Sequence, residues 1–215
     1  MKRIFIIAGS PDVDIGFFVK LSEEMKGADG LYAVDSGLEL ADVFELTVTK
    51  IIGDFDSIKP EILEKYSDDL KVSYKPEKDK SDLEIAIDTA IGDFSDEEFE
   101  ILTVNADGGR WDHFYFNLML LFKKPNRIRM IADDETIWAM AENHTYKLPG
   151  LSGCPFSILP VSECKDVSIS GAKYTLKNAV LSPFTTLTLS NRAESDLKIS
   201  FKSGKLLLYV GETIL

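Results

Sequence analysis

The most constraining feature of this sequence is a change of pattern near residue 132. Before it, short runs of β-branched and apolar residues alternate with segments in which apolar residues recur every three or four positions. Runs of the first kind suit strands and those of the second suit amphipathic helices, so their alternation predicts an α/β unit. Such a unit has a mostly parallel sheet with helices on both faces. After residue 132 the runs are short, rich in Thr, Ser and Val, and show no helical period, which predicts an all-β antiparallel sandwich.

This change of pattern places two domains at residues 1–132 and 133–215. The strands expected in the first domain are 2–8, 31–34, 47–52, 70–74, 99–104 and 127–132. The helices expected between them are 14–26, 38–44, 60–66, 81–91 and 111–122, with a capping box formed by Ser81 and Glu84. The strands expected in the second domain are 136–141, 144–148, 156–160, 167–170, 185–190, 197–201 and 206–210.

Charge is divided unequally between these two parts. The whole chain carries a net charge of −12, with 16 basic and 27 acidic side chains in residues 1–132 against 8 and 9 in the remainder. An acidic surface repels a phosphate backbone, which excludes a general nucleic-acid partner. No apolar stretch approaches the ~18–20 residues of a membrane span. The first apolar run is short and is followed closely by Asp12 and Asp14, so we expect a strand there rather than a signal peptide, and a cytoplasmic protein.

Acidic and small polar residues follow several of the expected strands. Asp35-Ser36-Gly37 follows the second strand, Gly53-Asp54-Phe55-Asp56-Ser57 the third, and Asp79-Lys80-Ser81-Asp82 opens a helix. In open α/β sheets, ligands bind outside the carboxyl ends of the strands. Taken alone, the first cluster is better explained by a turn with a helix N-cap. The preference for acid in a first helical turn explains Asp82 but not Asp79, which precedes the cap.

The pair Asp54 and Asp56 indicates a metal. In an extended segment, residues two apart point the same way, so these two carboxylates would converge while Phe55 packs on the opposite side. Neighbouring carboxylates repel each other unless a cation lies between them, and oxygen ligands suit Mg²⁺. The alternative is an ordinary polar turn.

A fourth polar cluster, Asp107-Gly108-Gly109-Arg110-Trp111-Asp112-His113, follows the strand at 99–104. Two glycines that open a helix leave backbone N–H groups for an anion. Arg110, His113 and Asn117 share one helix face because they are spaced by three and four residues. A solvated face would more often carry Lys and Glu, so we interpret this group as functional.

Taken in order, these clusters resemble the thiamine pyrophosphokinase family over essentially the whole chain. Further similarity lies in Gly171-Ala172-Lys173-Tyr174-Thr175-Leu176 and in Ser190-Asn191. The resemblance implies an N-terminal α/β domain, a C-terminal β-sandwich and a homodimer. It also implies transfer of the pyrophosphoryl group of ATP to the hydroxyl of thiamine, with AMP as the second product.

The resemblance also implies roles for particular residues. Asp54, Asp56, Asp79 and Asp82 would hold Mg²⁺ and ATP, and Arg110 would contact the phosphates. The ATP side would be completed by Asp35, Ser36, Ser57, Asp112, His113 and Asn117. Ser190 and Asn191 would reach thiamine from the partner subunit. The sequence departs from the family at Ser36, where a second glycine is usual, and it offers no obvious aromatic residue to stack on the thiamine pyrimidine.

Three other functions remain open at this point. A related pyrophosphokinase acting on a pterin-like heterocycle would use the same N-terminal motifs. A haloacid-dehalogenase-type phosphatase would use Asp54 and Asp56 with the later pair Asp133 and Asp134, but it would leave the Gly-Gly-Arg cluster without a role. A non-catalytic sensor of thiamine or nucleotide would need no metal carboxylates.

Overall fold

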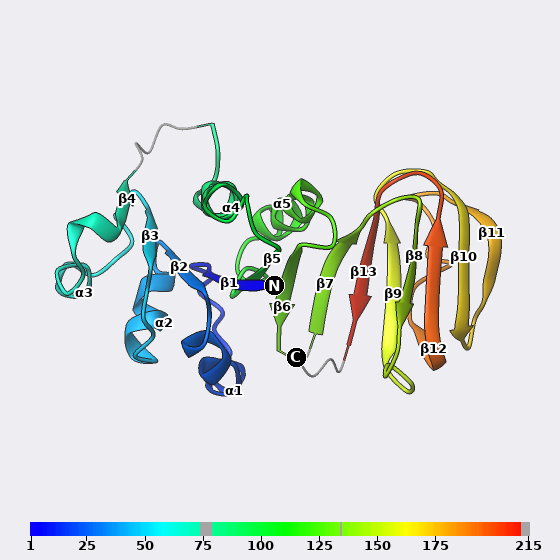
Figure 1. The fold of residues 1–215 in the computed structure, drawn as a ribbon, viewed down its shortest axis with the longest axis horizontal. Helices are drawn as coiled ribbons and strands as arrows, with labels where there is room; N and C mark the ends of the chain where they lie inside the picture. Colours follow the sequence, from blue (N-terminus) through cyan, green and yellow to red (C-terminus); the bar gives the residue numbers. More distant parts are fainter. Residues whose placement is uncertain (74–78, 134, 212–215) are drawn as a thin grey trace. The chain divides into compact units, whose positions relative to one another are not determined.

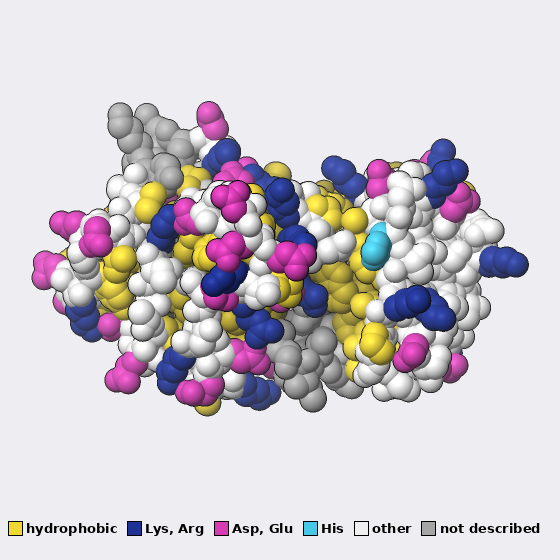
Figure 2. Space-filling model, viewed as in Figure 1, with side chains coloured by type: hydrophobic (Ala, Val, Ile, Leu, Met, Phe, Trp, Pro, Cys, Tyr) yellow, Lys and Arg dark blue, Asp and Glu magenta, His cyan; other side chains and the backbone are white. Residues whose placement is uncertain are grey.

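The computed structural model describes residues 1–73, 79–133 and 135–211. Within them the chain divides into two compact units, which we describe separately. The α/β unit comprises Met1–Lys123 and Arg127–Asp133. The antiparallel unit comprises residues 124–126 and the described residues from 135 onward. Figure 2 shows many acidic side chains over the visible face of the α/β unit, as the charge count predicts.

All strands of the α/β unit pair in parallel, in the order β6-β5-β1-β2-β3-β4. Their bounds are Lys2–Ile7 (β1), Gly30–Val34 (β2), Lys50–Gly53 (β3), Lys71–Ser73 (β4), Phe99–Val104 (β5) and Ile128–Ala132 (β6). The chain builds outward from β1 to β4, then returns to place β5 on the other side of β1. The direction of winding therefore reverses between β1 and β5, and that is where open α/β sheets form a crevice.

Helices lie on both faces of this sheet, with α1 and α2 on one face and α4 and α5 on the other (Figure 1). The helices are Ile15–Lys26 (α1), Gly37–Val43 (α2), Pro60–Leu63 (α3), Asp82–Asp93 (α4) and Trp111–Leu120 (α5), with 3-10 turns at Asp68–Leu70 (η1) and Leu121–Lys123 (η2). Asp14 and Ser81 cap two of them by accepting the N–H groups of Phe17 and Glu84. The Ser81 half of the predicted capping box is therefore confirmed.

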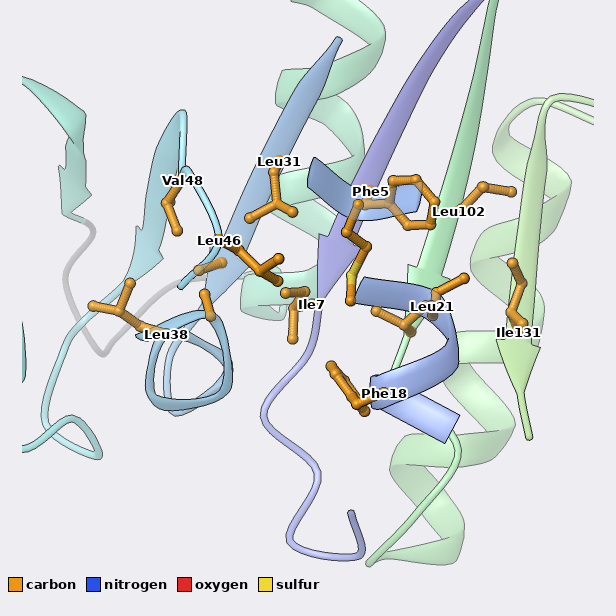
Figure 3. Packing of buried hydrophobic residues seen from close by; sticks show 14 of the residues in the cluster. Phe5, Ile7, Phe18, Leu21, Leu31, Leu38, Leu46, Val48, Leu102 and Ile131 are labelled. Carbon is orange, nitrogen blue, oxygen red and sulfur yellow. The ribbon is translucent and has the colours of Figure 1, made fainter. Parts of the chain in front are cut away.

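The apolar core beneath α1 and α2 takes every second side chain of β1. Phe5 and Ile7 of β1 point into one cluster, together with Phe18 and Leu21 of α1 and Leu38 of α2 (Figure 3). Successive side chains of a strand face opposite sides of the sheet, so Ile4 and Ile6 of β1, which are also fully buried, face the other side of the sheet. Burial on both faces therefore determines which side chains of β1 face α1 and α2.

The antiparallel unit forms two sheets around one core. Its strands are Glu135–Met140 (β7), His144–Leu148 (β8), Pro155–Pro160 (β9), Cys164–Ala172 (β10), Leu176–Leu181 (β11), Asn191–Phe201 (β12) and Leu206–Val210 (β13). One sheet contains β7, β13 and β9, and the other contains β8, β10 and β11. The long strand β12 joins β9 at its start and then runs between β8 and β10. Apolar side chains from both sheets, such as Phe156, Ile158, Val167 and Leu197, form a shared core.

The fold class predicted from the sequence is confirmed, but several elements differ. The expected strand at 185–190 is wrong: hydroxyl groups of Ser182 and Thr185 accept backbone N–H groups there and hold the chain in turns. The strand β11 was not expected, because only one of its six side chains is buried and it lacks an apolar alternation.

Two shorter elements also differ from expectation. The helix expected at 60–66 ends at Leu63. The strand expected at 70–74 is shorter, since residues 68–70 form a 3-10 turn and Tyr74 lies outside the described residues. No helix within the described ranges has the length and apolar character needed to cross a bilayer.

Candidate active site

A cleft of about 380 Å³ opens in the α/β unit at the carboxyl ends of its strands. Its walls come from the loops that follow β1, β2, β3 and β5 and from the start of α4. Seven of the residues singled out in the sequence line it, namely Asp35, Ser36, Ser57, Asp82, Arg110, His113 and Asn117. Asp54, Asp56, Asp79 and Asp112 are not part of this lining. The cleft lies at the reversal between β1 and β5, where ligands are expected in this architecture.

The loop after β2 is held by close packing against its neighbours. Asp35 has a left-handed backbone with φ of 46°, and its N–H donates to Ile52 O at 3.1 Å. Gly53, with φ of 153°, makes room for the Asp35 carboxylate, since a Cβ atom there would lie 1.8 Å from Asp35 Oδ1. Ser36 Oγ donates to Gly9 O at 3.2 Å. Ser36, where the family usually has glycine, therefore ties two loops of the cleft together.

The segment after β3 differs from the extended form expected from the sequence. Phe55 has a left-handed φ of 68°, and the N–H of Asp56 donates to Asp54 Oδ1 at 3.3 Å, so the segment is a turn. Phe55 still packs against the apolar core, as expected. The two carboxylates remain close, and as a consequence a hydrogen bond with Asp54 and repulsion from Asp54, with a further contribution from Asp82, raise the pKa of Asp56.

Asp54 and Asp82 thus both affect Asp56, and these three carboxylates come from two elements near the cleft. Asp82 lies in the first turn of α4 and lines the cleft, while Asp54 and Asp56 lie in the turn after β3. Asp79 is exposed and precedes the Ser81 cap of α4. Within the described residues, no three His, Cys, Asp or Glu side chains form a ready-made metal-binding group. Asp54, Asp56 and Asp82 are therefore close enough for charge repulsion to act on Asp56, but they do not already have the geometry of a coordination shell.

In the turn between β5 and α5, one backbone N–H group that was expected to be available for an anion already has a partner. The N–H of Gly109, expected to be available for an anion, donates to Asp12 Oδ2 at 2.8 Å. Arg110, the N-cap residue of α5, pairs with Asp112, with Nε 3.1 Å from Oδ1. This guanidinium hydrogen bond holds the pKa of Asp112 at about 2. Arg110 and Asp112 are both exposed, so a phosphate could reach the guanidinium by competing with Asp112.

His113 and Asn117 lie on the cleft side of α5, one helical turn apart. Asn117 Nδ2 donates to Ala106 O at 2.8 Å and so fixes the loop that follows β5. One of the two hydrogens on this amide nitrogen is therefore used within the protein, which leaves the second hydrogen and the amide oxygen for ligand contact. Arg110, His113 and Asn117 all line the cleft, so the structure brings together the three residues of this predicted helix face.

Several cleft residues were missed in the sequence. Gly9 and Ser10, which follow β1, and Asn105, which follows β5, all line the cleft. The signal that could have found them is the rule already applied to the other strands, that polar residues directly after a parallel strand lie at the ligand-binding edge. Gly9 and Ser10 directly follow the strand expected at residues 2–8, so this rule applies to them as well.

The two residues expected to contact thiamine lie in the antiparallel unit. Ser190 is exposed and has a left-handed φ of 56°. Asn191 is 5% exposed, and its Nδ2 donates to Tyr174 O at 2.7 Å while its Oδ1 accepts the Tyr174 N–H at 3.1 Å. Asn191 therefore joins the start of β12 to the loop between β10 and β11.

Comparison with known proteins matches both parts of the chain. Residues 21–132 match the family model for the thiamin pyrophosphokinase catalytic domain, and residues 145–206 match that for the thiamin pyrophosphokinase vitamin B1 binding domain. The thiamine pyrophosphokinase of Bacillus subtilis (strain 168) is 32% identical, over 97% of this chain and 98% of its own.

Solved structures agree with this match. The crystal structure of thiamine pyrophosphokinase from Bacillus subtilis superposes with a TM-score of 0.84 at 28% identity, covering all of both chains. That of thiamin pyrophosphokinase from Geobacillus thermodenitrificans gives a TM-score of 0.82 at 30% identity, covering 97% of each. The parallel sheet with its cleft, the antiparallel unit and the two domain matches lead to one conclusion: this chain belongs to the thiamine pyrophosphokinase family of enzymes.

Proposed function

We propose that this chain transfers the terminal pyrophosphoryl group of ATP to the hydroxyl group of thiamine. The hydroxyl oxygen forms a bond to the β-phosphorus, and the bond from that phosphorus to the oxygen bridging it to the α-phosphorus breaks. The products are thiamine diphosphate and AMP, and the hydroxyl proton passes to a base. The observation that carries the proposal is the group of neighbouring carboxylates, Asp54, Asp56 and Asp82, beside a cleft that also presents Arg110.

These carboxylates suit a magnesium ion. A hydrogen bond with Asp54, together with repulsion from Asp54 and Asp82, raises the pKa of Asp56, which means that a cation placed among these carboxylates would be stabilised. Carboxylate oxygens are the ligands that Mg²⁺ takes together with substrate phosphates. Asp54, Asp56, Asp79 and Asp82 are the proposed ligands, directly or through water. A bound Mg²⁺ would supply neutralisation of the negative charge on the triphosphate.

The other cleft residues position the nucleotide. Arg110 binds the phosphates when a phosphate oxygen replaces Asp112 on its guanidinium, because both partners are exposed. The hydroxyl group of Ser57 offers a further donor from the loop after β3, and Ser36, whose hydroxyl donates to Gly9 O, lines the cleft from the loop after β2. The nucleotide side is completed by Asp35, Asp112, His113 and Asn117.

Thiamine is the proposed acceptor, and its cationic thiazolium ring suits an acidic site. By the family resemblance, the chain acts as a homodimer, and Ser190 and Asn191 of the partner subunit reach the pyrimidine. For Asn191 the available contacts are limited, since its amide nitrogen and oxygen already bond to Tyr174. Ser190, which is exposed, is the more accessible of the two.

The direct test is to identify the products. Purified protein incubated with thiamine, ATP and Mg²⁺ is expected to yield AMP and thiamine diphosphate in equal amounts, with neither formed when thiamine is left out. Separation of nucleotides by chromatography distinguishes the possible reactions. Release of ADP with thiamine monophosphate, or of free phosphate alone, would reject pyrophosphoryl transfer.

A second experiment tests the shared site. Arg110→Ala and Asn191→Ala subunits, each inactive and each confirmed to be folded, are mixed under conditions that allow subunit exchange. Because a mixed dimer would contain one site with neither substitution, partial recovery of AMP formation is expected. Absence of recovery after demonstrated exchange would indicate sites built within one chain.

A further inference from the structure

Asn105 is a buried polar residue whose place in the cleft the proposed reaction does not explain. It directly follows β5, is 5% exposed, and lines the cleft. Its backbone is left-handed with φ of 56°, a conformation that few residues other than glycine, asparagine and aspartate adopt readily. A polar residue kept at such a position is expected to have a specific hydrogen-bonding task.

The task visible in the structure is to hold the loop after β1. Asn105 Nδ2 donates to Ala8 O and to Ser10 O, each at 2.9 Å, which uses both of its amide hydrogens. The backbone carbonyl oxygen of Asn105 accepts the Ser10 N–H at 3.3 Å. One residue thus fixes the backbone on both sides of Gly9.

The loop that Asn105 holds is a wall of the cleft. Gly9 O accepts a hydrogen bond from Ser36 Oγ at 3.2 Å, and Asp12 Oδ2 accepts the N–H of Gly109 at 2.8 Å. A Cβ atom at Gly108 would lie 2.3 Å from Ser10 Oγ, so the loops after β1 and β5 touch. A shift of the β1 loop would therefore disturb the loops that carry Ser36 and Arg110.

We propose that Asn105 is a positioning residue for the nucleotide, acting through the loop after β1. The inference rests on the proposed function, in which this cleft binds ATP. Asparagine suits the position because it combines tolerance of a left-handed backbone with two donors. Glycine would keep the backbone but lose both donors, and aspartate would direct a carboxylate at two carbonyl oxygens.

The test compares Asn105→Gly and Asn105→Asp with the wild type. Binding of a non-hydrolysable ATP analogue with Mg²⁺, measured by titration calorimetry, is expected to weaken roughly tenfold to a hundredfold in both variants, as expected for the loss of two buried hydrogen bonds. In turnover assays the KM for ATP rises while the KM for thiamine changes little. Exchange of the Ser10 and Gly109 amide hydrogens becomes faster, because the loop is no longer held.

Thr49→Val is the matched control for lost stability. Thr49 precedes β3, at the end of the sheet opposite the cleft, and its hydroxyl bonds to the backbone of Leu31. This variant should unfold at a lower temperature and bind the analogue as the wild type does. If the Asn105 variants also bind as the wild type does, the positioning role is wrong. If the wild type itself binds no analogue, the proposed function is wrong and this inference fails with it.

Discussion

The two units of this chain use their polar residues differently. In the α/β unit, polar side chains gather at one edge of the sheet, where every parallel strand ends in the same direction and the loops after β1, β2, β3 and β5 meet. In the antiparallel unit, successive strands end at opposite edges, and of the two polar residues singled out there, Asn191 is buried and bonded to Tyr174 while Ser190 is exposed. Parallel topology by itself therefore brings distant motifs together, whereas antiparallel topology does not.

The largest expected difference between the units concerns the removal of one carboxylate. Asp56→Asn is expected to reduce turnover about a hundredfold or more, because it removes a proposed ligand of the Mg²⁺ that would neutralise the phosphates. Asp166→Asn, which changes an exposed, left-handed acid of the antiparallel unit, should leave turnover unchanged. Rates of AMP formation at saturating substrates measure both. Equal rates for Asp56→Asn and wild type would show that Asp56 has no role in the reaction.

A second difference concerns glycines with positive φ. Gly53→Ala places a Cβ atom against the Asp35 carboxylate and is expected to destabilise the fold by about 2–4 kcal/mol. Gly150→Ala, with φ of 78° and no atom within 4 Å of the new Cβ, should cost only about 1–2 kcal/mol. Urea unfolding of both variants gives the comparison. Equal losses would mean that backbone strain, and not the contact with Asp35, governs Gly53.

A third prediction addresses Asn191. Asn191→Asp keeps the acceptor of the Tyr174 N–H but removes the donor to Tyr174 O, with an expected loss of about 1–3 kcal/mol in unfolding free energy. A purely structural residue would lower stability and leave the KM for thiamine of the folded enzyme unchanged. A rise in that KM at a temperature where the variant is folded would support the contact with thiamine.

The smallest expected effect is on the pH dependence of stability. Because Asp54 and Asp82 raise the pKa of Asp56 in the folded state, ionisation of Asp56 costs stability as the pH rises through that pKa. Without divalent cations, Asp56→Asn should therefore melt slightly above the wild type at pH 7, and the difference should vanish under acidic conditions where Asp56 is protonated. Melting curves in a chelator between pH 3 and pH 8 test this. A variant less stable than wild type at neutral pH would contradict it.

The sequence predicted the fold well where local pattern and topology agree. The alternation of strand-like and helix-like segments correctly predicted the parallel sheet. Ser81 caps α4, as its spacing with Glu84 indicated. It failed at 185–190, where hydroxyl groups bond to the backbone in turns, and at β11, whose exposed side chains give no apolar pattern. The turns at 185–190 depend on side-chain hydrogen bonds to the backbone, and β11 depends on pairing with a neighbouring strand. Neither feature changes the spacing of apolar residues, so the pattern of apolar residues could not predict them.

The site was predicted less completely than the fold. The motifs after β2, β3 and β5 contributed residues to the cleft, but Asn105 and Gly9-Ser10 were missed. The bond from Gly109 to Asp12 was also unforeseen, because it joins residues far apart in sequence. Family membership disfavours the pterin, phosphatase and sensor alternatives. Of the acidic pair that the phosphatase interpretation required, Asp134 lies outside the described residues.

The central claim is that carboxylates at the edge of the α/β sheet bind ATP together with Mg²⁺. Titration calorimetry with a non-hydrolysable ATP analogue, in the presence and absence of Mg²⁺, tests it directly on wild type, Asp56→Asn and Asp166→Asn. We predict Mg²⁺-dependent binding in wild type and Asp166→Asn, and its loss in Asp56→Asn. Binding that is equally tight in all three proteins, or that does not depend on Mg²⁺, would contradict the account.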